Sequence, residues 1–157
     1  MSPDEKYGPG VRRYIEESKK LLAQKQALLE RVKTYKFDTI AVHGLYTAEE
    51  AINQNQGAVI EPVYFSSSQA YRDADELEAA LAYLIPTWCY TRIANPTTYY
   101  LQSALALLEG YQTGADTSCL VTASGMSAIA LATDAFLVQQ KSGAEKINFV
   151  SSVQLSG

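Results

Sequence analysis

Metal-binding side chains are scarce in this sequence of 157 residues, which has two cysteines and one histidine. Cys89 and Cys119 lie far apart, each beside apolar or aromatic neighbours, and no Cys-x-x-Cys pair occurs. Zinc sites need clustered Cys and His ligands, so we predict no metal site. Both thiols are expected to be free and buried, because cysteine packs as a small apolar residue. His43 has no partner pattern around it, which favours a hydrogen-bonded structural role.

Clustered positive charge and long apolar runs are lacking too. The net charge is -4 and the isoelectric point is near 5.0, with lysine and arginine scattered along the chain. This pattern predicts no binding to nucleic acid or to an anionic membrane. No apolar run approaches the roughly 20 residues that cross a bilayer, and residues 1–10 lack the apolar core of a signal peptide. We therefore expect a cytoplasmic protein.

The longest regular pattern in the sequence is amphipathic. From Val11 to Val32, apolar residues recur at helical spacing and charged residues fill the opposite face, which predicts one long helix. Residues 37–71 lack a sustained period and are predicted to form an extended arm. A long irregular arm favours either contact with another subunit or lining of the active site. We group residues 1–72 as an N-terminal helix and arm, and residues 73–157 as the incomplete start of a larger domain.

Two helix starts follow the arm. Asp73 can cap a short helix, and Asn95-Pro96-Thr97 signals a second, because Asn accepts from free amides and Pro has no amide to lose. The second helix is predicted to reach Glu109, and Gly110 suits a left-handed residue after it. The buried face of the second helix is predicted to consist of Leu101, Ala104, Leu105 and Leu108.

The C-terminal third has the sequence pattern of a β-turn-α unit. Residues 118–122 form a short apolar run, Gly125 follows, and an almost wholly apolar helix is predicted over residues 126–138. Residues 147–150 are typical of a second strand, so the unit is expected to close as βαβ with parallel strands. Apolar parallel strands occur in sheets that helices cover on both sides. We therefore expect an α/β fold whose sheet is incomplete within this chain.

Two places are suited to an anion. Ser124, Gly125 and Met126 lie between the predicted strand and the apolar helix, where free amides and the helix dipole favour phosphate. Tyr90 and Arg92 combine a phenol with a fork-shaped cation suited to phosphate or carboxylate. Each pattern also has a purely structural interpretation, as turn geometry for the Ser-Gly pair and as a surface ion pair for the arginine. Spacing alone does not decide between them.

Five stretches between Phe37 and Ser152 are informative when they are taken together. They are Phe37-Asp38-Thr39 with Ala41-Val42-His43-Gly44, Gly57-Ala58-Val59-Ile60 with Pro62-Val63-Tyr64, Tyr90-Thr91-Arg92-Ile93-Ala94-Asn95-Pro96-Thr97, Leu108-Glu109-Gly110, and Ser124-Gly125-Met126-Ser127-Ala128-Ile129. In this order they resemble the pyridoxal-phosphate-dependent enzymes of Cys/Met metabolism, such as cystathionine and methionine lyases and O-acetylhomoserine sulfhydrylases. One stretch would be a weak signal, whereas five in order are specific.

The resemblance implies an aspartate-aminotransferase-like fold, with a mainly parallel sheet and flanking helices, and pyridoxal 5'-phosphate as the cofactor. Gly125 and Met126 would give backbone amides to the cofactor phosphate, beside the Ser124 hydroxyl. Tyr90 and Arg92 would reach the phosphate of a neighbouring subunit's cofactor. The active site would then be shared across a dimer, commonly within a homotetramer.

The resemblance also implies an activity on a small amino acid. We favour γ-replacement on O-acetylhomoserine with a thiol or sulfide, and the alternative is γ-elimination by a methionine or cystathionine lyase. The Schiff-base lysine and the aspartate that pairs with the pyridine nitrogen would fall beyond Gly157, so the chain alone is expected to be inactive. Residues 153–157 also lack the tyrosine that stacks on the cofactor in the family, and Gln102 replaces a common glutamate.

Two hypotheses from other classes stay open. One is a non-catalytic subunit that lends Tyr90 and Arg92 to a partner chain carrying the lysine, and copurification of a second polypeptide would favour it. The other is an ordinary phosphate-binding α/β module, which would show no selectivity for the aldehyde cofactor.

Overall fold

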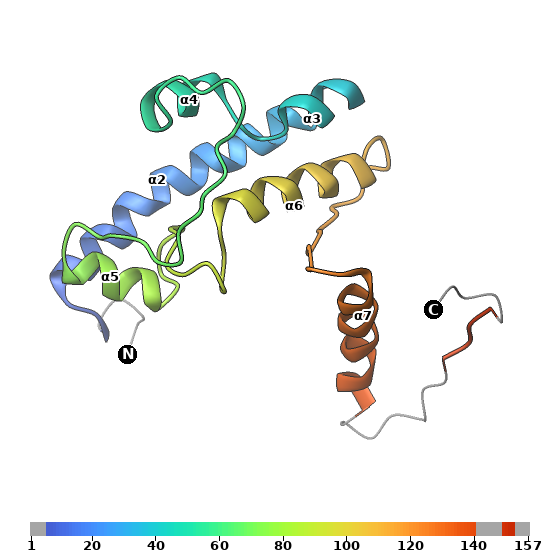
Figure 1. Cartoon of the computed structure of the whole chain (residues 1–157). Helices are drawn as coiled ribbons and strands as arrows, with labels where there is room; N and C mark the ends of the chain where they lie inside the picture. Colours follow the sequence, from blue (N-terminus) through green and yellow to red (C-terminus); the bar gives the residue numbers. More distant parts are fainter. Residues whose placement is uncertain (1–5, 141–148, 153–157) are drawn as a thin grey trace. The chain divides into compact units, whose positions relative to one another are not determined.

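The computed structural model describes residues 6–140 and 149–152 (Figure 1). It divides into two compact units, Met1–Cys119 (unit 1) and Leu120–Gly157 (unit 2), each of which is described by itself. Within the described ranges, every regular element is an α-helix and no strand is assigned. The one isolated β-bridge in these ranges joins Ser68 to Tyr90. None of these helices is long and apolar enough to span a bilayer.

In unit 1, α2 (Pro9–Val32) confirms the predicted amphipathic helix. Gly8 precedes it in an extended conformation, and Pro9 at the first helical position loses no hydrogen bond, because the first amides of a helix have no acceptor within it. Its buried apolar side chains lie near both ends, with Val11 and Tyr14 at the start and Val32 at the finish. The helix therefore supports two separate cores.

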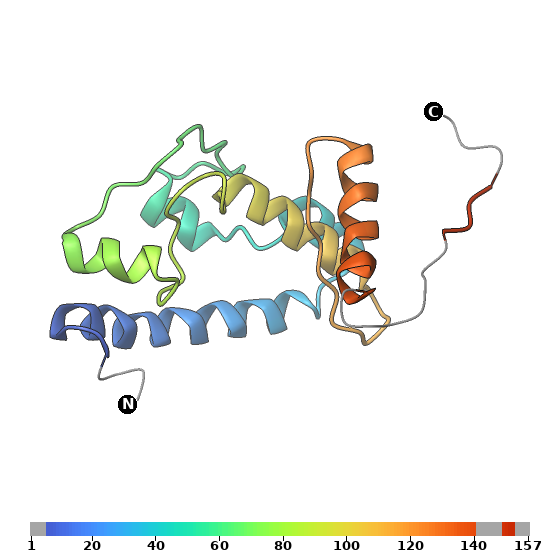
Figure 2. The same ribbon diagram turned by 90° about the horizontal axis from the view of Figure 1, so that it is seen from below.

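At its N-terminal end, α2 packs against α5 (Ala74–Leu81), as Figure 2 shows. Val11, Tyr14 and Ala79 form this core. The Tyr14 hydroxyl donates a hydrogen bond of 2.7 Å to Asp73, which lowers the pKa of that carboxyl, while Asp73 caps α5 as predicted. The two chain segments approach so closely that a Cβ on Gly10 would lie 1.9 Å from Asp75 Oδ2.

At its C-terminal end, α2 meets α3 (Phe37–His43) and α6 (Pro96–Glu109). Val32, Ile40, Leu45 and Tyr100 are the buried residues of this second core. Partly buried tyrosines surround it, and the rings of Tyr46 and Tyr100 meet edge to face with centroids 5.9 Å apart. This core joins the predicted N-terminal arm to the helix that follows the Asn-Pro-Thr cap.

The extended conformation predicted for residues 37–71 is wrong over its first half. That half contains α3 and α4 (Ala48–Gln54), and residues 58–71 are then irregular apart from the Ser68 bridge. The Thr47 side chain accepts a hydrogen bond of 3.1 Å from the Glu50 amide and so caps α4. Thr-x-x-Glu is a capping-box pattern, which is a local signal for this helix.

A hydrogen bond between Tyr100 and Glu50 links α6 to α4. The Tyr100 hydroxyl donates a hydrogen bond to Glu50, and both burial and this carboxylate raise the pKa of Tyr100. Partial burial, together with the charge of Glu50, raises the pKa of Glu61 above its ordinary value of 4.5. Ionised Glu61 therefore opposes folding, and the opposition ends as the pH falls through its raised pKa towards 4.5.

We expect Glu61→Gln to stabilise unit 1 at pH 7, by less than about 1 kcal/mol because solvent screens the charge. The gain should vanish below pH 4.5, where the carboxyl is protonated in both folded and unfolded chains. Urea unfolding at several pH values, followed by the fluorescence of Trp88, measures it. The exposed Glu49→Gln on α4 is the matched control and should show no such pH-dependent gain.

The face of α6 that is buried differs from the predicted one. Leu101 is 50% exposed and Leu105 is 37% exposed, whereas Tyr100 is buried and Leu108 packs partly against the second core. The reason is tertiary, because α3 and α2 approach α6 on the side that carries Tyr100. Leucine spacing alone could not specify that side.

Gly110 ends α6 for a steric reason. It has a φ of -82°, so the predicted left-handed conformation is wrong. A Cβ at this position would lie 2.5 Å from the Thr117 hydroxyl oxygen, which donates a hydrogen bond to the Ala106 carbonyl. The left-handed residues come later, at Gln112 and Gly114.

Unit 2 contains α7 (Gly125–Gln140), which confirms the predicted apolar helix. The predicted sheet is not confirmed. Residues 118–122 are not assigned to a strand, and the predicted strand at residues 147–150 lies partly outside the described residues. A strand needs a neighbour to pair its amides and carbonyls, and the described part of the chain offers this run none. The predicted domain division between residues 72 and 73 stays a prediction.

Candidate functional site

In unit 1, the candidate phosphate-binding residues lie on a turn that is fixed by its backbone. Tyr90 bridges to Ser68 in antiparallel fashion, and the Thr91 amide donates to the Ser67 carbonyl at 3.0 Å. The Ala94 amide donates to the Tyr90 carbonyl at 3.0 Å and closes the turn. The Thr91 hydroxyl also donates to the Ser66 carbonyl. The turn is thus attached to a segment more than twenty positions earlier in the sequence.

Asn95 connects this turn to α6 and is only 4% exposed. Its side-chain oxygen accepts from the Thr97 amide at 2.9 Å, which is the helix cap that the sequence predicts. Its side-chain nitrogen donates to the Tyr64 carbonyl and to the Thr91 hydroxyl oxygen, both at 3.1 Å. One buried amide therefore holds three segments together.

The side chains of Tyr90 and Arg92 face each other on the exposed surface of the turn. The Arg92 guanidinium carbon lies 5.4 Å from the centre of the Tyr90 ring, a cation-π distance. Within the described part of the chain, Arg92 has no carboxylate partner. Among the described residues the surface ion pair considered as the alternative is not formed, and the guanidinium fork is available to an anion.

In unit 2, the second candidate group lies at the start of α7. The Ser124 hydroxyl oxygen accepts from the Ser127 amide at 3.1 Å and is paired with the Ser127 hydroxyl at 2.9 Å. Ser124 thus acts as a helix cap. The amides of Gly125 and Met126 have no acceptor in the part of the chain that the structure describes.

These donors fit a phosphate group. A Cβ added at Gly125 would meet no atom within 4 Å, so the backbone can be approached closely there. Free amides at a helix start and an unpaired guanidinium are donors that phosphate takes in proteins. Tyr90 lies beside Arg92, and Ser124, Gly125 and Met126 are contiguous, but the two groups belong to separate units.

Sequence reasoning missed the second role of Asn95. The Asn-Pro-Thr pattern predicts its cap, but nothing in the sequence pairs its amide with the Tyr64 carbonyl, 31 positions away. Of the other residues considered, Cys89 is buried as predicted and Cys119 is half-buried, both as free thiols. His43 is exposed and makes no side-chain hydrogen bond to a described residue, so its predicted structural role is not supported.

Comparison with known proteins identifies the family. Residues 38–149 match the model of the Cys/Met metabolism PLP-dependent enzymes, and the chain belongs to this family. Pyridoxal phosphate is therefore the cofactor of its relatives, as the resemblance implied. No solved structure matches the chain.

Individual relatives are similar in sequence to this chain over about 100 residues. The chain is 38% identical over 101 residues to an L-methionine gamma-lyase of Pseudomonas deceptionensis, a match that covers 64% of this chain and 23% of that protein. It is 33% identical over 100 residues to an O-acetyl-L-homoserine sulfhydrylase of Leptospira meyeri, covering 64% and 21%. An L-methionine gamma-lyase of Pseudomonas putida is 33% identical over 93 residues, covering 59% and 21%. The chain thus spans about a fifth of the length of these relatives.

Proposed function

We propose that this chain contributes the phosphate-holding part of a pyridoxal-phosphate site in an enzyme of sulfur amino-acid metabolism. Gly125 and Met126 would hold the phosphate with their backbone amides, next to the capping residue Ser124. Tyr90 and Arg92 would hold the phosphate of a cofactor in a neighbouring subunit. The observation that carries the proposal is the Arg92 guanidinium, which has no carboxylate partner among the described residues and lies on a hydrogen-bonded turn at the surface of unit 1.

Each residue has a distinct task in this proposal. The cofactor, when bound, supplies an electron sink, and the protein's part is to bind and orient it. The α7 amides favour a dianion through the helix dipole, and Arg92 adds a positive charge with two parallel donors. Asn95 acts through Thr91 and the turn, so it is a positioning residue.

The reaction we propose for the whole protein is cleavage at the γ-carbon of a small amino acid. The relatives named gamma-lyase and sulfhydrylase both carry out chemistry on four-carbon amino acids with a γ-substituent. Replacement of that substituent by a thiol or sulfide remains our prediction, and elimination is the alternative. A product assay with and without added sulfide separates them, because only replacement needs the added nucleophile.

The exposure of Tyr90 and Arg92 also suits a role in trans. A non-catalytic subunit could present this turn to a partner chain that carries the lysine, and such a partner should copurify with this chain. A homodimer or homotetramer that shares its sites in the same way would need no second polypeptide. Mass spectrometry of the purified complex distinguishes these two arrangements.

Binding of pyridoxine 5'-phosphate tests the site. This alcohol cannot form a Schiff base with surface lysines, so its binding reports recognition of the phosphate. We expect it to bind more tightly than pyridoxine, and Arg92→Gln to weaken it about tenfold through the loss of a charge-assisted contact. Equilibrium dialysis measures both ligands.

The matched control for that experiment is Arg12→Gln. Arg12 is exposed on α2, and its side chain has no partner among residues 6–140 and 149–152, so binding should not change. Equal binding of pyridoxine and its phosphate, or an unchanged affinity in Arg92→Gln, would contradict the proposal.

A further inference from the structure

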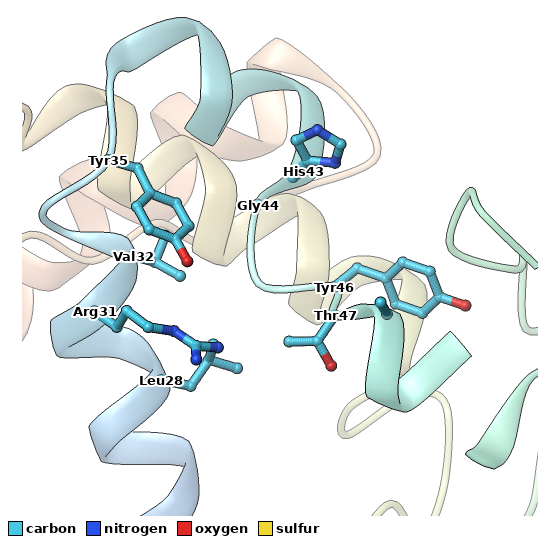
Figure 3. Close-up of a pocket in the computed structure, with 9 residues that line it drawn as sticks. Leu28, Arg31, Val32, Tyr35, His43, Gly44, Tyr46 and Thr47 are labelled. Carbon is cyan, nitrogen blue, oxygen red and sulfur yellow. The ribbon is translucent and has the colours of Figure 1, made fainter. Parts of the chain in front are cut away.

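A pocket of about 240 Å³ lies between the C-terminal half of α2 and the turn that joins α3 to α4 (Figure 3). Leu28 and Val32 of α2 form an apolar wall of the pocket. Five other residues bring polar side chains to its lining. They are Arg31, Tyr35, His43, Tyr46 and Thr47, and the Tyr46 hydroxyl already donates to the Ala58 carbonyl. All of these residues belong to unit 1.

Four of the polar side chains of the pocket have unused hydrogen-bond donors. The Arg31 guanidinium, the Tyr35 hydroxyl and the His43 ring make no side-chain hydrogen bond or ion pair to any residue that the structure describes. The Thr47 oxygen accepts from the Glu50 amide, which leaves its own proton free. Figure 3 shows the Arg31 side chain reaching from α2 toward Thr47, with the Tyr35 hydroxyl between the two segments.

The charge on the lining of the pocket is positive and comes from Arg31. None of its lining residues is an aspartate or glutamate, although the chain as a whole has a net charge of -4. Four cationic side chains elsewhere, Arg13, Lys19, Lys33 and Arg72, form ion pairs with acids. An unpaired guanidinium beside uncommitted hydroxyls is a site for an anion.

We propose that this pocket binds a small organic carboxylate. The guanidinium fork of Arg31 matches the two oxygens of a carboxylate, and the hydroxyls of Tyr35 and Thr47 can donate to the same group. The wall of Leu28 and Val32 favours a short aliphatic tail over inorganic phosphate, whose remaining oxygens would face carbon. A volume below the usual range for drug-sized ligands limits the tail to a few carbons.

The site is independent of the proposed cofactor site. None of Tyr90, Arg92, Ser124, Gly125 and Met126 lines the pocket. The α2 side of the pocket also precedes the segment that matches the family, which begins at residue 38, while His43 and Thr47 lie within it. The proposed carboxylate site therefore combines a helix outside the matched segment with residues inside it.

Titration of the full chain with sodium butyrate tests the proposal. We expect saturable chemical-shift changes in amide and side-chain NMR signals of Arg31, Tyr35 and Thr47, and about tenfold weaker binding in Arg31→Gln. Arg31→Lys should restore part of the affinity, because it keeps the charge but loses the fork. Circular dichroism verifies that α2 forms in each variant.

Controls make the outcome decisive. Arg12→Gln, on the same helix but outside the pocket, should bind butyrate like the unaltered chain. The alcohol 1-butanol lacks the charge and inorganic phosphate lacks the tail, so both should bind more weakly than butyrate. Equal binding of either probe, shifts spread over the whole chain, or an unchanged affinity in Arg31→Gln would overturn the proposal.

Discussion

Replacement of Ile40 by alanine is expected to lower the free energy of unfolding of unit 1 by about 2–5 kcal/mol. Ile40 is 1% exposed and packs with Val32, Leu45 and Tyr100 in the core that joins α2, α3 and α6. Removing three carbon atoms there loses their transfer from water and leaves a cavity that the surrounding helices fill only partly. Urea unfolding followed by the fluorescence of Trp88, which lies in unit 1, measures the loss.

The matched control uses the same residue type on a neighbouring helix. Ile52 of α4 is 71% exposed, so Ile52→Ala should change the free energy of unfolding by less than about 0.5 kcal/mol. A similar loss in both variants would show that the Ile40 core does not support this unit. The slope of the urea transition should stay the same in both, because the surface exposed on unfolding is nearly unchanged.

Asn95→Ala is expected to lower the free energy of unfolding of unit 1 by about 2–4 kcal/mol. The substitution removes the cap on the Thr97 amide and leaves the partly buried Tyr64 carbonyl without its donor. It also frees the Thr91 hydroxyl from one partner, so the turn that carries Tyr90 and Arg92 should loosen. Amide hydrogen exchange at Thr91 should quicken in the variant.

Two further variants isolate the parts of this effect. Asn95→Asp keeps the oxygen that caps Thr97 but replaces the donor to Tyr64, so α6 should stay capped while exchange at Thr91 still quickens. Asn53→Ala changes an exposed asparagine of α4 and should cost less than about 0.5 kcal/mol. Wild-type exchange in Asn95→Asp would mean that Asn95 is a cap and nothing more.

The helix starts could be predicted because their signals are local. The predicted caps Asp73 and Asn95 each accept a hydrogen bond from an amide two or three positions later, so a short stretch of sequence contains both partners. The amphipathic pattern of α2 is likewise complete within one helix. The short helices α3 and α4, of seven residues each, were missed because two turns show little periodicity.

The candidate site was predictable only as residue types. The motifs around Arg92 and Gly125 pointed to phosphate, and the family match agrees with the cofactor that they implied. Whether Arg92 is paired with a carboxylate depends on which segments lie beside the turn, and no spacing rule contains that information. The pocket at Arg31 was not predicted, because its two walls come from separate stretches of the chain.

By itself, the sequence determined the helix caps, the long amphipathic helix and the family, since each of these depends on residues close together or in a fixed order. Only the tertiary structure decided which side of α6 is buried, how Asn95 joins three segments and where Arg31 meets the α3–α4 turn. The physical reason is that burial and hydrogen bonding bring together groups that are distant in sequence. Local propensity depends only on neighbouring residues, so it does not specify which distant groups come into contact.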